Sequence, residues 1–212
     1  MPGTLPCPAA FVAVRALAAA LLACAGALAP TLPHAEPAPL RGIALQDHRG
    51  QPVTPASLDG QVLVLNFIFT TCSATCPTQV RELAAVHDAL PASVRASTRW
   101  LSVSVDPLSD TPATLAAFAR RLDAERPGWR FATGAPTQVQ QLADRMAAFE
   151  RSGRTPRPED HRTSIWLYDT RGELVLRLAG APLDRARLAR EITQLAGPAP
   201  ERLTLNQRPN AR

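Results

Sequence analysis

The stretch from Gln61 to Pro77 reads QVLVLNFIFTTCSATCP, and it decides the fold of this chain. Its first half, Gln61–Phe69, is a dense run of Val, Leu, Ile and Phe, which is typical of a central strand buried on both faces. The run ends in a Thr- and Ser-rich turn that holds Cys72 and Cys76. Pro77 fits the first turn of a helix, where its missing N–H costs nothing, and apolar residues at helical spacing follow it. The stretch therefore predicts a strand, a turn with two cysteines and a helix.

Strands and helices continue to alternate along the rest of the chain. Further strands are predicted at Ile43–Leu45 and Val53 around the turn 46–50, and at Trp100–Val105, Trp129–Ala132, Ser164–Tyr168 and Glu173–Leu178. Further helices are predicted from Asp110 or Thr111, over Thr137–Phe149 and over Leu183–Leu195. This order predicts an α/β, thioredoxin-like fold, in which helices flank a central mixed sheet and an antiparallel hairpin closes it.

The segment 1–35 is predicted to be a targeting segment with a Pro-rich linker. A basic residue, the apolar run Ala16–Ala29 and several prolines follow one another in the order of a secretory signal. Three interpretations remain open, namely a lipid anchor at Cys24, a cleaved signal and a retained membrane anchor. All three place the domain 36–197 in the bacterial cell envelope, on the periplasmic side of the inner membrane, anchored or soluble. The tail 198–212 is predicted to be disordered.

Composition argues against nucleic acid as a partner. The formal net charge is +5 and all 23 basic residues are arginine, but these are scattered and not interleaved with aromatic residues. The cysteines are more informative. Cys7 and Cys24 lie in the targeting segment, so the exported domain keeps only Cys72 and Cys76. Two cysteines four residues apart do not make a disulfide framework, and they indicate a functional site instead.

Cys72 and Cys76 are suited to redox and metal chemistry. Peptide N–H groups at the start of a helix favour thiolate over thiol, and thiolate is the form that attacks disulfides and binds metals. At i and i+4 the two Cα atoms lie about 6 Å apart, which allows either a disulfide or two sulfurs on one metal ion. The alternative of two buried, inert cysteines is disfavoured, because they sit in a polar turn directly after a strand.

A second loop supplies a candidate third ligand. Thiol–disulfide oxidoreductases of this fold carry C-x-x-C and a proline before a later strand, whereas here three residues separate the cysteines and the later loop reads EDHRTS over 159–164. Thr163 lies near the expected proline position, with His161 just before it. Two thiolates and an imidazole suit Cu(I) and can also hold Cu(II), while zinc normally takes a fourth ligand. His87 is predicted to be a surface or half-buried helix residue, and His48 to face solvent in a turn.

Several motifs together resemble one known family. They are Asn66–Pro77 (NFIFTTCSATCP), Ser102–Thr114 (SVSVDPLSDTPAT), Gly128–Gly134 (GWRFATG) and Asp160–Gly172 (DHRTSIWLYDTRG), within a similarity from about Ile43 to Leu195. With these motifs the chain resembles the Sco/SenC proteins, copper chaperones for the CuA centre of cytochrome c oxidase. The resemblance implies that Cys72, Cys76 and His161 bind copper and that Asp160 tunes the site. It also makes Asp106 and Asp110 structural positions, at a strand end and a helix cap.

The resemblance implies ligand exchange rather than enzymatic turnover. The reduced protein would bind copper and pass it to the CuA-bearing subunit of the oxidase or to another copper acceptor. Where the N-terminal segment is an anchor, it would hold this protein at the membrane. A Cys72–Cys76 disulfide would abolish binding, so a thiol reductant protein is a second expected partner. Two alternatives remain. One is a thiol–disulfide reductase that keeps CuA cysteines reduced, with Cys72 as the attacking thiolate. The other is a redox or copper sensor.

Overall fold

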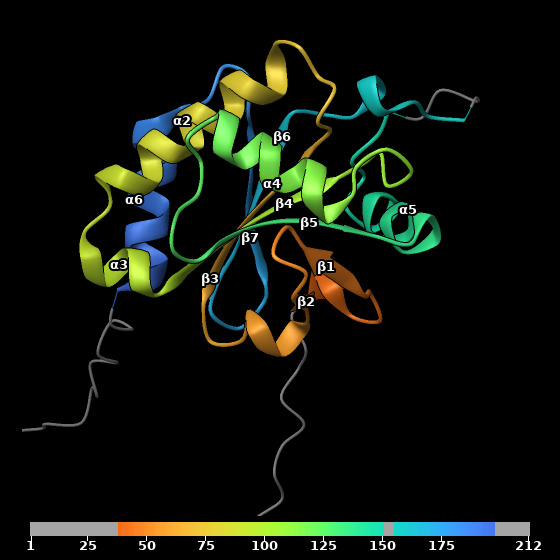
Figure 1. Ribbon diagram of the computed structural model, residues 1–212. Helices are drawn as coiled ribbons and strands as arrows, with labels where there is room; N and C mark the ends of the chain where they lie inside the picture. The colour runs from red at the N-terminus through yellow and green to blue at the C-terminus, as the bar shows by residue number, and fades with distance from the viewer. Residues whose placement is uncertain (1–37, 151–154, 198–212) are drawn as a thin grey trace, which may run out of the picture. The chain divides into compact units, whose positions relative to one another are not determined.

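A mixed sheet runs through the middle of the molecule, with helices against it (Figure 1). The structure is a computed structural model that describes residues 38–150 and 155–197, so the predicted targeting segment and the tail lie outside the described residues. No helix within the described ranges is both long and apolar enough to cross a membrane. The strands are β1 (Leu45–Asp47), β2 (Pro52–Val53), β3 (Val62–Ile68), β4 (Thr98–Ser104), β5 (Trp129–Gly134), β6 (Ser164–Tyr168) and β7 (Leu174–Ala179). The helices are α2 (Thr75–Ala89), α3 (Ala92–Ala96), α4 (Pro112–Arg121), α5 (Pro136–Arg145) and α6 (Arg185–Ala196), with short 3-10 turns η2 (Ala38–Leu40), η3 (Pro55–Ser57) and η4 (Pro158–Asp160).

The strand order within the described residues is β2-β1-β5-β4-β3-β6-β7. β3, β4 and β5 run parallel, as strand–helix–strand units require, and β6 pairs antiparallel with β3. Because Asn66 pairs with Ile165 in that antiparallel register, β6 begins at the edge of the sheet where β3 ends. The loop before β6 therefore lies on the same side of the sheet as the turn that carries the cysteines. The predicted mixed sheet with flanking helices and a closing hairpin is confirmed.

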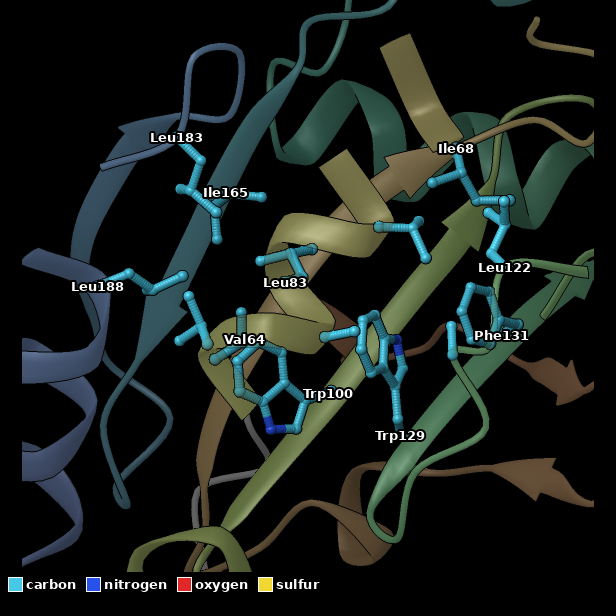
Figure 2. Close-up of a cluster of buried hydrophobic side chains, with 14 of the residues drawn as sticks. Val64, Ile68, Leu83, Trp100, Leu122, Trp129, Phe131, Ile165, Leu183 and Leu188 are labelled. Atoms are coloured by element: carbon cyan, nitrogen blue, oxygen red, sulfur yellow. The ribbon is translucent and has the colours of Figure 1, made fainter. Parts of the chain in front are cut away.

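The sheet separates two hydrophobic clusters, because successive side chains of a strand point to opposite faces. Every residue of β3 is buried. Val62, Val64 and Ile68 join the cluster that contains apolar residues of α2, α4 and α6, while Leu63 and Leu65 join the cluster with α5 and the N-terminal hairpin. Figure 2 shows part of the first cluster, in which the indoles of Trp100 and Trp129 lie between strands and α2.

The element boundaries differ from the predicted ones mainly at helix ends. α2 begins at Thr75, which places Cys76 inside its first turn. The helix predicted to reach Phe149 ends at Arg145, because Ala147 adopts a left-handed φ of 48°. The chain then leaves the helix, and Phe149 forms an antiparallel bridge with His161. This early helix end positions the loop of His161. The sequence does not reveal the end, because its apolar periodicity continues past Arg145.

Candidate metal site

The two cysteines lie together at the carboxyl end of β3. Cys76 is 2% exposed in the first turn of α2, and Cys72 is half-buried in the turn before the helix. The backbone N–H of Cys76 donates to the Sγ atom of Cys72 across 3.3 Å. Both thiols are free in this structure. Their predicted proximity is confirmed, although Cys72 precedes the helix rather than forming part of it.

The two thiols have opposite acidities. Burial alone would raise the pKa of Cys72, but hydrogen bonds outweigh it and lower that pKa; they come from the backbone and thiol of Cys76 and from the backbone of Ala74 and Thr75. Burial raises the pKa of Cys76 to about 12, and its hydrogen bond to Cys72 acts in the same direction. Cys72 is therefore the first thiolate of the pair, while Cys76 keeps its proton and donates it toward Cys72.

This asymmetry predicts selective alkylation. Iodoacetamide at about pH 7 should modify Cys72 much faster than Cys76, because only thiolate reacts and only Cys72 is accessible as thiolate. Peptide mass spectrometry of the full chain separates these two sites from Cys7 and Cys24. Replacing Cys76 with alanine should slow the labelling of Cys72 at this pH, since the change removes a hydrogen bond that lowers the pKa of Cys72. Equal labelling rates at Cys72 and Cys76 would contradict the assignment.

The cysteine turn is tied to the loop after β4. Asp110 is 1% exposed, and its carboxyl group accepts hydrogen bonds from the backbone N–H of Thr70 (3.0 Å), the hydroxyl of Thr70 (2.5 Å) and the hydroxyl of Ser104 (2.5 Å). Asp110 and Thr111 were the two predicted candidates for the helix cap, and Thr111 caps α4, by accepting from the N–H of Thr114. Asp110 thus holds the turn that leads to Cys72. The cluster of aspartates in the Ser102–Thr114 motif was the only sequence signal for it.

His161 lies near the cysteines but is turned to its own loop. Its ring packs edge to face on Phe69, with the ring centroids 5.6 Å apart. Phe69 also contacts the dithiol through its backbone, because its carbonyl accepts from the N–H of Cys72 at 3.3 Å and its backbone hydrogen-bonds to the thiol of Cys76. Phe69 is the shared neighbour of all three predicted ligands, and sequence reasoning missed this role.

The ring of His161 has a defined tautomer. Burial lowers its pKa, although hydrogen bonds with the backbone of Pro158 and Phe67 act in the opposite direction. The neutral ring has a single N–H, and Nδ1 lies 2.6 Å from the carbonyl oxygen of Pro158. That distance requires the proton on Nδ1, so the lone pair is on Nε2. A backbone carbonyl that accepts from the N–H of one ring nitrogen, and so leaves the lone pair to the other, is the usual arrangement of a metal-binding histidine.

The donor set fits a soft metal ion, but its three members are not gathered in this structure. Within residues 38–150 and 155–197 no three His, Cys, Asp or Glu side chains lie close enough together to hold a metal. Two thiols and one neutral imidazole nevertheless match the preference of copper for sulfur and nitrogen donors. His161 must come closer to Cys72 and Cys76 to complete the set.

The other predicted site residues take different places. Asp160 accepts a hydrogen bond from the backbone N–H of Arg157 at 2.9 Å, so it shapes the loop of His161, and its predicted tuning role stays a prediction. The predictions for His48 and His87 were wrong, because these residues are 6% and 3% exposed. His48 accepts from the N–H of Phe131, and His87 packs on two tryptophans of the core. Long-range packing over a helix and a turn buries both, which local sequence does not reveal.

The fold and the site together define a class of protein. It is a thioredoxin-like domain with a reduced C-x-x-x-C pair at the first turn of the helix after a central strand. A histidine-bearing loop lies at the same sheet edge. A model of the SCO1/SenC family matches residues 41–197, and the chain therefore belongs to that family.

Individual relatives agree with this assignment. The SCO1 protein homolog of Bacillus subtilis (strain 168) is 30% identical over 134 residues, which are 61% of this chain and 68% of that protein. The chain spans only 55% of the mitochondrial SCO2 homolog of Bos taurus, at 31% identity over 157 residues and 71% of this chain.

Solved structures match across most of the described domain. ScoI of Bradyrhizobium japonicum, solved with copper bound, is 25% identical, with a TM-score of 0.61 over 72% of this chain and 96% of that one. BsSco, described as a member of the Sco family of cytochrome c oxidase assembly proteins with a disulfide switch, is 24% identical. Its TM-score is 0.60 over 72% of this chain and 90% of that one.

Proposed function

We propose that this protein binds copper through Cys72, Cys76 and His161 and delivers it to the CuA centre of cytochrome c oxidase. The observation that carries the proposal is the pair of free thiols at the carboxyl end of β3, of which Cys72 is the readier thiolate. The expectation of copper agrees with the metal in the structure of Bradyrhizobium japonicum ScoI. The expectation of an oxidase agrees with the description of BsSco as a member of a family of oxidase assembly proteins.

Each residue has a distinct task in the proposed transfer. Cys72 supplies the first thiolate, because its thiol loses its proton most easily. Cys76 becomes the second sulfur ligand only when it releases its proton, so copper binding strengthens as pH rises. His161 adds a neutral nitrogen donor. Transfer follows when the thiolates of an acceptor replace these ligands one at a time, with no net redox change of the copper.

The redox state of the dithiol gates this cycle. Formation of a Cys72–Cys76 disulfide by exchange with a disulfide of another protein passes an electron pair and both thiol protons to that protein, whose disulfide becomes two thiols. It leaves neither Cys72 nor Cys76 as a thiolate ligand. A thiol reductant protein returns the electron pair by exchange and restores the binding form. The proposed setting is the periplasmic side of the bacterial inner membrane, where the CuA-bearing subunit would be the acceptor.

Copper retention tests the proposed site. All variants carry Cys7→Ser and Cys24→Ser, so that Cys72 and Cys76 are the only thiols. The reduced protein receives an equimolar amount of Cu(I) and passes through a desalting column. The protein that keeps Cys72 and Cys76 should retain the metal. Adding Cys72→Ser or Cys76→Ser should weaken its affinity for Cu(I) at least about 100-fold, which exceeds the usual loss when a residue behind a ligand is changed. Ser73→Ala, an exposed change between the cysteines, is the matched control, and loss of copper from the wild type would refute the proposal.

A thiol–disulfide reductase is the second candidate, favoured by the acidity difference between the thiols. A low-pKa attacking thiolate beside a protonated second thiol is the arrangement of a dithiol reductant. The His161→Ala variant separates the two functions. A chaperone loses copper affinity with this change, whereas a reductase retains its rate of disulfide exchange with a CuA-domain disulfide.

A further inference from the structure

A continuous chain of hydrogen bonds, buried except at its partly buried last link, crosses from the sheet to the loop of His161. The indole Nε1 of Trp129 donates to the hydroxyl of Ser102 (3.0 Å), which donates to Oδ1 of Asn66 (2.7 Å). The Nδ2 of Asn66 donates to Oε1 of Gln79 (2.9 Å). The Nε2 of Gln79 then donates to the backbone carbonyl of Thr163 (2.8 Å). We name this set the polar relay.

The two ends of the polar relay determine the direction of every bond in it. An indole N–H can only donate, and a backbone carbonyl can only accept, so the hydroxyl and the two amides between them have a single consistent orientation. The side chains are almost fully buried, with exposures of 0% for Ser102 and 2% for both Asn66 and Gln79. A buried amide that loses a partner has no water to replace it, so the relay strongly favours one geometry.

A glycine packs against the last bond of the relay, between Gln79 and Thr163. A Cβ atom on Gly180, in the loop after β7, would lie 2.0 Å from Nε2 of Gln79 and 2.0 Å from the carbonyl oxygen of Thr163. No side chain fits there. The backbone of Gly180 therefore packs directly over this bond, and a side chain at position 180 would displace Gln79 or Thr163.

The relay joins the elements that carry the proposed ligands. Gln79 follows Cys76 by three residues on α2, which places both on one face of the helix. Thr163 follows His161 by two residues, and two residues of extended chain reach only about 7 Å. While the bond from Gln79 to Thr163 holds, His161 can swing about Thr163 but cannot leave the neighbourhood of Cys76.

We propose that Gln79 is a positioning residue for the copper site, which holds the pivot of the His161 loop against the helix that carries Cys76. This inference rests on the proposed function. It assigns no direct contact with the metal to Gln79. The simpler alternative is that the relay only stabilises the core. Its loss would then lower the stability of the fold, and any loss of copper affinity would not depend on His161.

The test compares breaks at the two ends of the relay. Gln79→Met keeps the volume of the side chain but removes the bond to Thr163, whereas Ser102→Ala breaks the relay at the sheet and leaves that bond in place. Both changes are made in the full chain with Cys7→Ser and Cys24→Ser. Amide hydrogen exchange of the peptide around His161–Ser164 should be faster in Gln79→Met than in the parent protein, and unchanged in Ser102→Ala. Cu(I) affinity should fall about tenfold in Gln79→Met, as for other outer-shell partners of metal ligands, and much less in Ser102→Ala.

A double-mutant cycle with His161→Ala shows whether Gln79 acts through His161. Gln79→Met should have no further effect on affinity in the His161→Ala background. The absorption spectrum of the Cu(II) form of the single variant Gln79→Met should shift toward the spectrum of His161→Ala. The same loss in both backgrounds, or unchanged affinity in Gln79→Met, would overturn the inference. If the wild type retains no copper, the proposed function fails, and unchanged hydrogen exchange in Gln79→Met would then refute the pivot as well.

Discussion

Replacing Trp129 with alanine should lower the free energy of unfolding by about 3–5 kcal/mol, the usual cost of removing a large buried aromatic side chain. Its indole is 1% exposed, stacks on Phe131 at a centroid distance of 5.5 Å and packs on Trp100 at 5.5 Å (Figure 2). The change also removes the first donor of the polar relay, so Ser102 loses the partner that orients its hydroxyl. Urea unfolding followed by circular dichroism measures the loss.

Two further variants make this measurement specific. Leu108→Ala, at a side chain that is 84% exposed, should change the stability by less than about 0.5 kcal/mol. Trp129→Phe keeps most of the stacking area but no N–H, so its stability should fall between those of Trp129→Ala and the wild type. A loss for Trp129→Ala no greater than that for Leu108→Ala would contradict the packing described for this cluster.

Replacing Asp110 with alanine should destabilise the protein by about 2–4 kcal/mol, because several buried donors lose their shared acceptor. The change should also loosen the turn before Cys72, since the backbone and the hydroxyl of Thr70 both donate to this carboxyl group. Thermal unfolding measures the first effect. The second predicts faster alkylation of Cys76, whose burial depends on the path of that turn.

Asp106 provides the matched control for Asp110. It belongs to the same sequence motif, but it is half-buried and contributes only its backbone to the hydrogen bonds of this loop. Asp106→Ala should therefore cost less than about 1 kcal/mol, as most partly exposed positions do. Equal losses for the two variants would mean that the motif acts as a whole and that Asp110 has no special role in holding the cysteine turn.

Much of the fold was predictable, because it depends on local patterns. The apolar run before Cys72 is long and unbroken, so it predicts a strand buried on both faces, and each later change between periods of two and 3.6 predicts a new element. The exact helix ends were not predictable. α5 stops at Arg145 although apolar residues continue, because Ala147 turns left-handed and the chain pairs with the loop of His161.

The exposure of single polar residues was the least predictable part of the fold. His87 follows a helical pattern that gives it no apolar role, yet two tryptophans from neighbouring strands cover it. His48 lies in a turn that looks solvated, yet it accepts a hydrogen bond from β5. Burial depends on which segments of the chain pack over a residue, and those segments lie far away in the sequence.

The residue types and their spacing alone determine the chemistry of this protein. Two cysteines separated by three residues after a buried strand, with a histidine before a later strand, specify a soft donor set at one edge of a mixed sheet. Tertiary structure alone decides how that set is held. It makes Cys72 rather than Cys76 the acidic thiol, aims His161 at a backbone carbonyl, and joins Gln79 to Thr163 beneath Gly180. The reason is that acidity and position depend on burial and on hydrogen-bond partners that folding brings together from distant parts of the chain.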